Sequence, residues 1–184
     1  MTLAVVLALL TLGRVTADLR DGWMFSRDGG AWRPVEVPHD WAIEGPFDPE
    51  GDPSTGKLPW KGKGRYRRTL VLDRAPAGER LWLDCEGVMM RSRVYVNGRA
   101  CGRGEYGYLG FRTDLTPYLA AGTNTIEIAA DTTAFHSRWY PGGGLYRPVR
   151  LVRASDVYLD DRDLSVTTPR VSPAEAAVRV TGKV

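Results

Sequence analysis

The segment Ser137–Val149 (SRWYPGGGLYRPV) combines side chains that could recognise a ligand with backbone that can bend freely. Arg138 offers a planar set of hydrogen-bond donors, which suits carboxylates and hydroxyl-rich ligands. Trp139 and Tyr140 offer flat apolar faces, which suit a stacked ring or a protein contact. The glycines Gly142–Gly144 allow the backbone to turn tightly and to approach a neighbour closely. The segment is therefore a candidate binding loop.

The histidines and cysteines do not suggest a metal site. The histidines are His39 and His136, and neither has a neighbour at the spacing of a metal-ligand motif. We therefore expect no metal and no cofactor. Cys85 and Cys101 each lie in or beside a strand-like run, so a disulfide bridge in an exported protein and two buried free thiols both fit the sequence.

The charge pattern argues against a nucleic-acid partner. The chain of 184 residues has a net charge of +3, is 43% hydrophobic and 26% charged, and can therefore build a globular core. Arginines are scattered with acidic residues among them, whereas a nucleic-acid binder concentrates its basic residues in one stripe. The densest basic stretch, residues 57–68, is typical of a solvated loop.

The N-terminus resembles an export signal. The apolar run Leu3–Leu12 is too short to span a bilayer, which needs about 20 residues, but it suits a signal-peptide core. Val15-Thr16-Ala17 offers a cleavage site, although no Lys or Arg precedes the run. We expect residues 1–17 to be a signal peptide or a disordered N-terminus, with a buried segment as the alternative. An extracellular or periplasmic location is favoured over a cytoplasmic one, and no membrane partner is expected.

Short apolar runs separated by turn residues predict an all-β chain. The expected strands are Thr69–Asp73, Leu81–Glu86, Ser92–Val96, Arg99–Gly102, Asn124–Ala129 and Leu145–Val152. Asn97-Gly98 is a strong signal for a tight hairpin, because both central residues of that turn need positive φ. Thr116-Pro117 predicts a short helix with Thr116 as its N-cap. Since no long helical period is present, the pattern favours an antiparallel β-sandwich.

The pattern changes after Asp156. Val157–Leu159, Leu164–Val166 and Val178–Val180 look like three further strands. A sandwich of immunoglobulin type takes about 100 residues, far more than this segment offers. We therefore expect residues 155–184 to be the first strands of a second, incomplete β-domain.

Several short motifs occur in an order that resembles one enzyme family. They are Asp21–Phe25 (DGWMF), Val37–Trp41 (VPHDW), Glu86–Val88 (EGV), Val94–Gly98 (VYVNG), Gly107–Phe111 (GYLGF), Asp114–Thr116 (DLT) and Ser137–Val149. Over about residues 19–184 the set resembles the N-terminal sugar-binding domain of glycoside hydrolase family two, the family of β-galactosidases, β-glucuronidases and β-mannosidases. VPHDW together with SRWYPG is most similar to the β-galactosidases. One departure is Arg65-Tyr66-Arg67, where the family usually has Trp-Tyr-Arg, so a packing tryptophan is lost in that loop.

The resemblance implies a jelly-roll sandwich over residues 18–154, followed by the start of an immunoglobulin-like domain over residues 155–184. In the family, the loops that carry VPHDW and SRWYPG lie together at the edge of the sandwich. They reach toward the active site of a separate (β/α)8 barrel, which carries both catalytic glutamates. The expected partners are therefore a β-galactoside or related carbohydrate and the missing C-terminal catalytic barrel. The resemblance is also compatible with a full-length enzyme that forms a homo-oligomer.

Four residues are candidates for substrate binding. The resemblance implies that Asp40 contacts sugar hydroxyls, although an Asp before Trp41 also commonly caps a turn. His39 fits a locally hydrogen-bonded loop histidine better than a ligand contact. Arg138 fits an ion pair that stiffens the loop as well as it fits a ligand contact. Trp139 fits an interdomain or core contact better than a sugar-stacking platform.

No catalytic residue is expected in this chain. Glycoside hydrolysis with retention uses two carboxyl groups about 5 Å apart. The acidic cluster Asp40, Glu44 and Asp48 comes from a Pro- and Gly-rich loop, which is not expected to hold such a pair. We expect a non-catalytic sugar-binding domain of a β-galactosidase-like hydrolase of O-glycosidic bonds, present without its barrel. A free-standing carbohydrate-binding module and an assembly domain that docks another chain are the alternatives.

Overall fold

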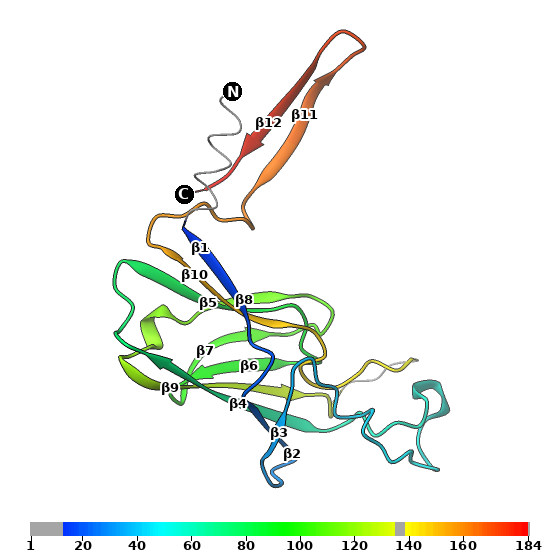
Figure 1. Ribbon diagram of the computed structural model, residues 1–184. Coiled ribbons are helices and arrows are strands. Elements are labelled where there is room, and N and C mark those ends of the chain that lie inside the picture. Colours follow the sequence, from blue (N-terminus) through cyan, green and yellow to red (C-terminus); the bar gives the residue numbers. More distant parts are fainter. Residues whose placement is uncertain (1–12, 135–138, 184) are drawn as a thin grey trace.

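Two antiparallel sheets form the body of the molecule, and a separate hairpin follows them (Figure 1). The computed structural model describes residues 13–134 and 139–183. The larger sheet has the order β3 (Arg33–Val35), β2 (Trp23–Arg27), β4 (Lys63–Leu72), β9 (Gly122–Asp131), β6 (Ser92–Val96), β7 (Arg99–Gly104). The smaller sheet has the order β1 (Arg14–Asp18), β10 (Val149–Ser155), β5 (Glu79–Cys85), β8 (Phe111–Asp114). This arrangement confirms the predicted all-β sandwich.

The two sheets enclose a hydrophobic core made by alternating residues of each strand. Ile126 and Ile128 of β9 point inward and are fully buried, because successive side chains of a strand point to opposite faces. Trp23 and Tyr66 fill the core from the same sheet, and Leu83 of β5 meets them from the other. Complete burial of one large apolar side chain contributes about 1.5–3 kcal/mol. The core therefore fixes the register of both sheets and, with it, the position of the loops at their ends.

The two local turn signals had different outcomes. Asn97-Gly98 forms the hairpin between β6 and β7 as predicted, with φ of 51° and 76°. The short helix is present as the 3-10 turn η2 (Thr116–Tyr118), but Leu115, and not Thr116, occupies the N-cap position. The cap prediction was wrong because the Thr116 hydroxyl lies beside β5, where it accepts a hydrogen bond from the Leu81 backbone N–H at 2.9 Å. Another 3-10 turn, η1 (Pro53–Thr55), lies between β3 and β4.

The predicted strand Leu145–Val152 begins later than expected, at Val149. Gly144 forms an isolated bridge with Met89, and Pro148 has no backbone N–H with which to extend the ladder. Between Gly144 and Pro148 the backbone does not form a strand, although Leu145 is fully buried. An apolar side chain in a buried loop was therefore taken for part of a strand.

The linker between sandwich and hairpin, residues 156–163, does not contain the predicted strand Val157–Leu159. Val157 is 73% exposed. Tyr158 instead packs its ring against Trp82 of β5, with the ring centroids 4.7 Å apart. Side-chain packing on the outer face of the small sheet takes the place of backbone pairing here.

Ion pairs fasten the same linker to the sandwich. Arg112 of β8 donates to Asp161 at 2.8 Å and to Asp84 of β5 at 2.9 Å. Arg14 of β1 lies 2.7 Å from the same Asp161 carboxylate. Burial opposes ionisation of Asp161, but the hydrogen bonds from Arg112 and Arg14 lower its pKa to about 2. The linker thus contacts β1 and β8 through Asp161, and it contacts β5 through Arg162, which forms an ion pair with Asp84.

The strands β11 (Ser165–Val171) and β12 (Ala176–Thr181) pair only with each other among the described residues, and they project away from the sandwich (Figure 1). Every residue of both strands is exposed. A two-stranded hairpin is marginally stable by itself and needs a further surface to pack on. It therefore has the character expected for opening strands of a second β-domain, while the boundaries 18–154 and 155–184 stay a prediction.

The N-terminal segment joins the small sheet. Val15-Thr16-Ala17, the expected cleavage site, lies within β1 and pairs with Leu151–Arg153 of β10. Cleavage after Ala17 would remove most of β1 from the edge of this sheet. Within the described part of the chain, no helix has the length and hydropathy needed to cross a membrane. Export stays a prediction.

Both cysteines are free thiols, which decides between the two alternatives left by the sequence. Cys85 is buried in the core between the sheets, and burial raises the pKa of its thiol well above the usual range. Cys101 lies in β7 with its sulfur 3.4 Å from the Val94 carbonyl, and partial burial raises its pKa to about 11. Both thiols are therefore protonated and unreactive at neutral pH.

Candidate functional site

Two loops that are distant in sequence lie side by side at the edge of the sandwich (Figure 1). We call residues 37–46 the Asp40 loop and residues 139–145 the Gly loop. The His39 backbone N–H donates to the Leu145 carbonyl at 2.7 Å, and the Trp41 N–H donates to the Gly143 carbonyl at 3.3 Å. The expectation that the VPHDW and SRWYPG segments meet is confirmed for the described part of the second.

Asp40 fastens the two loops with its carboxylate. Oδ1 accepts hydrogen bonds from the Ala42 N–H within its own loop and from the Gly143 N–H across the junction, both at 3.0 Å. Oδ2 accepts from the Tyr140 hydroxyl at 2.5 Å. Burial, together with this hydrogen bond to Asp40, raises the Tyr140 pKa far above its ordinary value, so the phenol stays protonated and donates. The predicted turn-cap role of Asp40 is confirmed, and the residue also acts across the junction.

The close contact between the loops requires glycine in the Gly loop. A Cβ atom on Gly143 would lie 2.5 Å from the indole ring of Trp41, which is buried in the core. A Cβ atom on Gly144 would lie 2.0 Å from the hydroxyl of Tyr66, and its φ of +92° is unfavourable for any other residue. The expected close backbone approach is therefore observed.

His39 has hydrogen-bond partners on both ring nitrogens. Nε2 lies 3.1 Å from a carboxylate oxygen of Glu44, and Nδ1 lies 2.7 Å from the Tyr66 hydroxyl. Hydrogen bonds from Arg33 and His39 hold the pKa of Glu44 below its usual value despite partial burial, so Glu44 accepts and Nε2 carries the proton. Burial is the main reason why the pKa of His39 is lowered. The expected local role of His39 is supported by this geometry.

Trp139 and its neighbours form an exposed rim beside the Gly loop. The indole of Trp139 is 58% exposed, and its Nε1–H donates to the Tyr108 hydroxyl at 3.0 Å. Tyr106 and Leu109, on the connection between β7 and β8, are 53% and 66% exposed. The exposure of Trp139 excludes the core contact that the sequence allowed, and leaves an interdomain contact or ring stacking. Arg138, the remaining candidate, lies outside the described residues.

The acidic residues near the loops all have structural partners. Asp40 is bound as above, and Glu44 forms an ion pair with Arg33. The Asp48 carboxylate accepts a hydrogen bond from the Glu50 N–H at 3.0 Å. These local partners give each carboxylate a role in holding its own loop.

Sequence reasoning missed the residues that complete these contacts. Tyr140 was considered for its flat ring, whereas its hydroxyl is what reaches Asp40. The sequence also predicted that a packing tryptophan is lost at Arg65. That position is not in the core, because Arg65 lies in β4 on the outer face of the sheet and pairs with Glu127. The core position is Tyr66, which is fully buried. Because successive side chains of a strand point to opposite faces, the alternation along β4 could have distinguished the outward-pointing Arg65 from the inward-pointing Tyr66.

Comparison with known proteins identifies the type of domain. The family model described as glycosyl hydrolases family 2, sugar binding domain, matches residues 51–161. Two antiparallel sheets with paired edge loops are thus the sugar-binding sandwich of a glycosyl hydrolase. The chain belongs to glycosyl hydrolases family 2, and the part of it that the structure describes contains no (β/α)8 barrel.

Three relatives illustrate this membership. The chain is 38% identical to the β-galactosidase BoGH2A of Bacteroides ovatus, covering 88% of this chain and 20% of that enzyme. It is 29% identical to a β-glucuronidase of Bacteroides fragilis, covering 87% and 24%. A crystal structure of a family 2 member from Bacteroides cellulosilyticus superposes with a TM-score of 0.81 at 28% identity, covering 91% and 24%. The chain therefore spans about a fifth to a quarter of the length of these proteins.

Proposed function

We propose that this chain supplies sugar-contacting loops to a β-galactosidase-like glycosidase, while the carboxyl pair that cleaves the O-glycosidic bond belongs to another part of the longer enzyme. The observation that carries the proposal is the fastening of the Asp40 loop to the Gly loop by one carboxylate. Loops that are already held in this way present polar groups to a ligand, so binding does not have to supply the free energy needed to order them. The relatives named β-galactosidase support the substrate class.

Asp40 retains the capacity to accept one more hydrogen bond. An ionised carboxylate offers about four lone-pair sites. Ala42, Gly143 and Tyr140 occupy three of these sites, two on Oδ1 and one on Oδ2. The remaining site on Oδ2 suits a hydroxyl donor such as a sugar O–H. Asp40 is thereby suited to hold the loops and to contact a sugar at the same time.

The exposed rim provides the second part of this role. Trp139 is oriented by its hydrogen bond to Tyr108 and presents an apolar face. Aromatic side chains held at a rim are typical anchors of protein contacts and also stack on sugar rings. We propose that Trp139 contacts the catalytic domain next to the sugar, with a β-galactoside or related carbohydrate as the ligand of the joined loops.

A chimeric enzyme tests the proposal. This chain would replace the matched segment of the Bacteroides ovatus relative, and kcat/KM would be measured with p-nitrophenyl β-galactoside. Asp40→Ala should lower kcat/KM at least about tenfold, because one charge-assisted hydrogen bond to the sugar is worth about 1.5–3 kcal/mol. Asp40→Asn should lower kcat/KM as well while disturbing the loops less, since its amide oxygen still accepts from both backbone N–H groups but an NH2 group replaces Oδ2, the acceptor proposed for the sugar hydroxyl.

The matched control is Asp48→Ala, which removes an exposed carboxylate nearby and should leave kcat/KM unchanged. Equal losses for Asp40→Ala and Asp48→Ala would contradict the proposal. The isolated chain should not turn over the same substrate, and turnover abolished by Asp40→Ala would also contradict it.

The exposed rim also fits a free-standing carbohydrate-binding module. That alternative predicts saturable calorimetric binding of galacto-oligosaccharides to the isolated chain, lost in Trp139→Ala. If the titration shows no heat of binding at millimolar sugar, the result favours the role in a longer enzyme over the free-standing module.

A further inference from the structure

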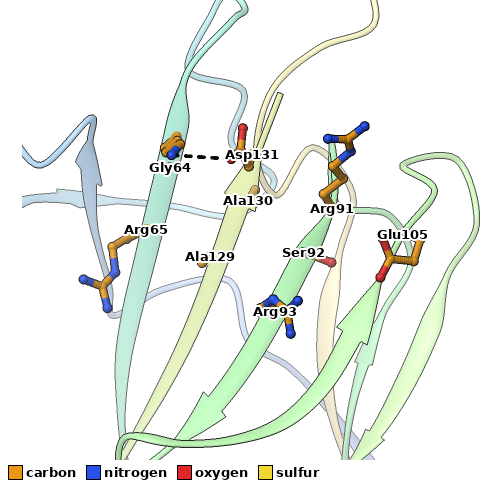
Figure 2. Close-up of a pocket in the computed structure, with 10 residues that line it drawn as sticks. Gly64, Arg65, Arg91, Ser92, Arg93, Glu105, Ala129, Ala130 and Asp131 are labelled. Atoms are coloured by element: carbon orange, nitrogen blue, oxygen red, sulfur yellow. Dashed lines mark ion pairs between the residues drawn. The ribbon is translucent and has the colours of Figure 1, made fainter. Parts of the chain in front are cut away.

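The outer face of the six-stranded sheet carries a pocket that none of the residues discussed in the two loops lines. It has a volume of about 400 Å³ and lies over β4, β9 and β6 (Figure 2). Its floor includes Ala129 of β9, and its sides include Arg65 of β4 and Arg93 of β6. The pocket is therefore separate from the Asp40 loop and the Gly loop, and it calls for its own explanation.

The strand register explains the shape of this pocket. Arg65, Ala129, Arg93 and Arg103 are direct cross-strand neighbours on β4, β9, β6 and β7. Figure 2 shows Arg65 and Arg93 on either side of Ala129. Because the alanine is short and the arginines are long, the central strand forms the bottom of a groove with guanidinium groups along its sides.

One of the three arginines in this row, Arg93, lacks an acidic partner among the described residues. Arg93 and Arg103 are directly opposite each other, and like charges in that position are destabilising. Arg65 has Glu127 as its partner, and Arg103 has Glu105 at 3.8 Å. Arg93 has no hydrogen bond or ion pair to any residue of the described part of the chain. An anionic group in the groove would relieve this repulsion and give Arg93 a partner.

The groove continues along the sheet. A second pocket of about 530 Å³ shares Arg65 with the first and is also lined by Arg67, Tyr95 and Glu127. The two pockets together form an elongated site with guanidinium, carboxylate and aromatic groups. Such a site suits a chain-like ligand with repeated polar groups better than a single small ion.

We propose that this groove, defined by Arg65, Ala129, Arg93 and Tyr95, binds an acidic saccharide whose carboxylate or sulfate group lies between Arg65 and Arg93. Guanidinium groups bind both anions through paired, charge-assisted hydrogen bonds. Family membership makes a saccharide the favoured anionic chain, whereas an acidic peptide would need no aromatic group beside the arginines. The residues that line the groove are not those of the joined loops, and the proposal does not depend on the function of those loops.

Calorimetric titration of the full chain tests the proposal with four probes: trigalacturonate, a sulfated galactotriose, neutral galactotriose and hexaglutamate. At least one acidic trisaccharide should bind at least about tenfold more tightly than the neutral one. Added NaCl should weaken this binding, because exposed charges are screened by salt. The stronger of the two acidic sugars identifies carboxylate or sulfate as the anion.

Two variants distinguish a built groove from general attraction. Arg93→Gln should weaken the acidic sugar about tenfold, and Ala129→Leu should weaken it similarly by filling the floor without changing the charge. Arg179→Gln is the control, since Arg179 is exposed on β12 and its removal changes the net charge equally. Thermal unfolding of each variant verifies the fold.

Three outcomes would overturn the proposal. The first is no binding of either acidic sugar, or equal binding of the neutral one. The second is an equal loss in Arg93→Gln and Arg179→Gln, which would indicate general charge attraction. The third is hexaglutamate binding as tightly as the acidic sugars, which would indicate a surface for an acidic protein segment.

Discussion

The Asp40 carboxylate and the Tyr140 hydroxyl lie 2.5 Å apart although one hundred positions separate them in the sequence. The same carboxylate also accepts from the backbone at Ala42 and Gly143. One half-buried side chain thus determines whether the Asp40 loop and the Gly loop behave as one surface or as two.

Asp40→Ala should destabilise the chain. It removes the acceptor of three hydrogen bonds, and we expect the free energy of unfolding to fall by about 2–3 kcal/mol, because hydrogen bonds to charged groups are worth about 1.5–3 kcal/mol each and water can replace part of them. Urea unfolding followed by tryptophan fluorescence measures this change. Tyr140→Phe removes one of the three bonds and should cost about 1 kcal/mol. A loss in Tyr140→Phe as large as that in Asp40→Ala would show that the backbone contacts contribute nothing.

Gly144→Ala should be far more harmful than a matched substitution at Gly56. Both glycines have positive φ, +92° and +69°, but a Cβ at Gly144 would meet the Tyr66 hydroxyl at 2.0 Å while Gly56 has open space. We expect Gly56→Ala to cost about 1 kcal/mol and Gly144→Ala to cost about 3 kcal/mol or more. Thermal unfolding of both proteins tests this, and similar midpoints would mean that the loops can separate without loss.

His39 should make stability depend on pH. Because burial lowers its pKa in the folded state, the unfolded state binds the proton more readily. The stabilisation is therefore present above the unfolded pKa of about 6.5 and is lost as the pH falls through the lowered folded value. Urea unfolding at pH 7.5 and 5.5, compared with His39→Gln, should show a larger loss on acidification in the native sequence. An equal loss in both proteins would assign the effect to other groups.

Asp161→Asn should loosen the linker. It removes the partner of Arg112 and Arg14, and trypsin cleavage after Arg162 should accelerate by about fivefold, a modest factor because Asp161 is partly exposed. Asp163→Asn, which breaks the exposed pair with Lys183, is the control and should change the rate little. Mass spectrometry of the fragments identifies the site. Equal rates in both variants would show that the packing of the linker is sufficient.

Local patterns in the sequence were enough to predict much of the sandwich. The turn Asn97-Gly98 and the alternation in β9 are determined by backbone conformation and by burial on one face, which short segments reveal. Val157–Leu159 was wrongly predicted as a strand because an apolar run does not say whether a pairing partner is available. Tyr158 found an aromatic partner on β5 instead.

The candidate site was predictable only in part. Family motifs indicated that the VPHDW and SRWYPG segments would meet, and their backbone hydrogen bonds bear this out. The partner of each polar group was not predictable, because Asp40 and Tyr140 are brought together by the packing of two whole sheets. The groove at Arg93 was missed for the same reason, since its row of arginines comes from strands that become neighbours only in the folded sheet.

The ionic contacts of the linker have a mechanical consequence. A hairpin on a flexible linker would adopt many orientations. Here Arg112 and Arg14 form ion pairs with Asp161, and Trp82 packs against Tyr158. These contacts restrain the linker, so the sandwich determines how β11 and β12 are oriented. Because salt screens partly exposed ion pairs, we expect higher ionic strength to weaken this connection between the sandwich and the hairpin.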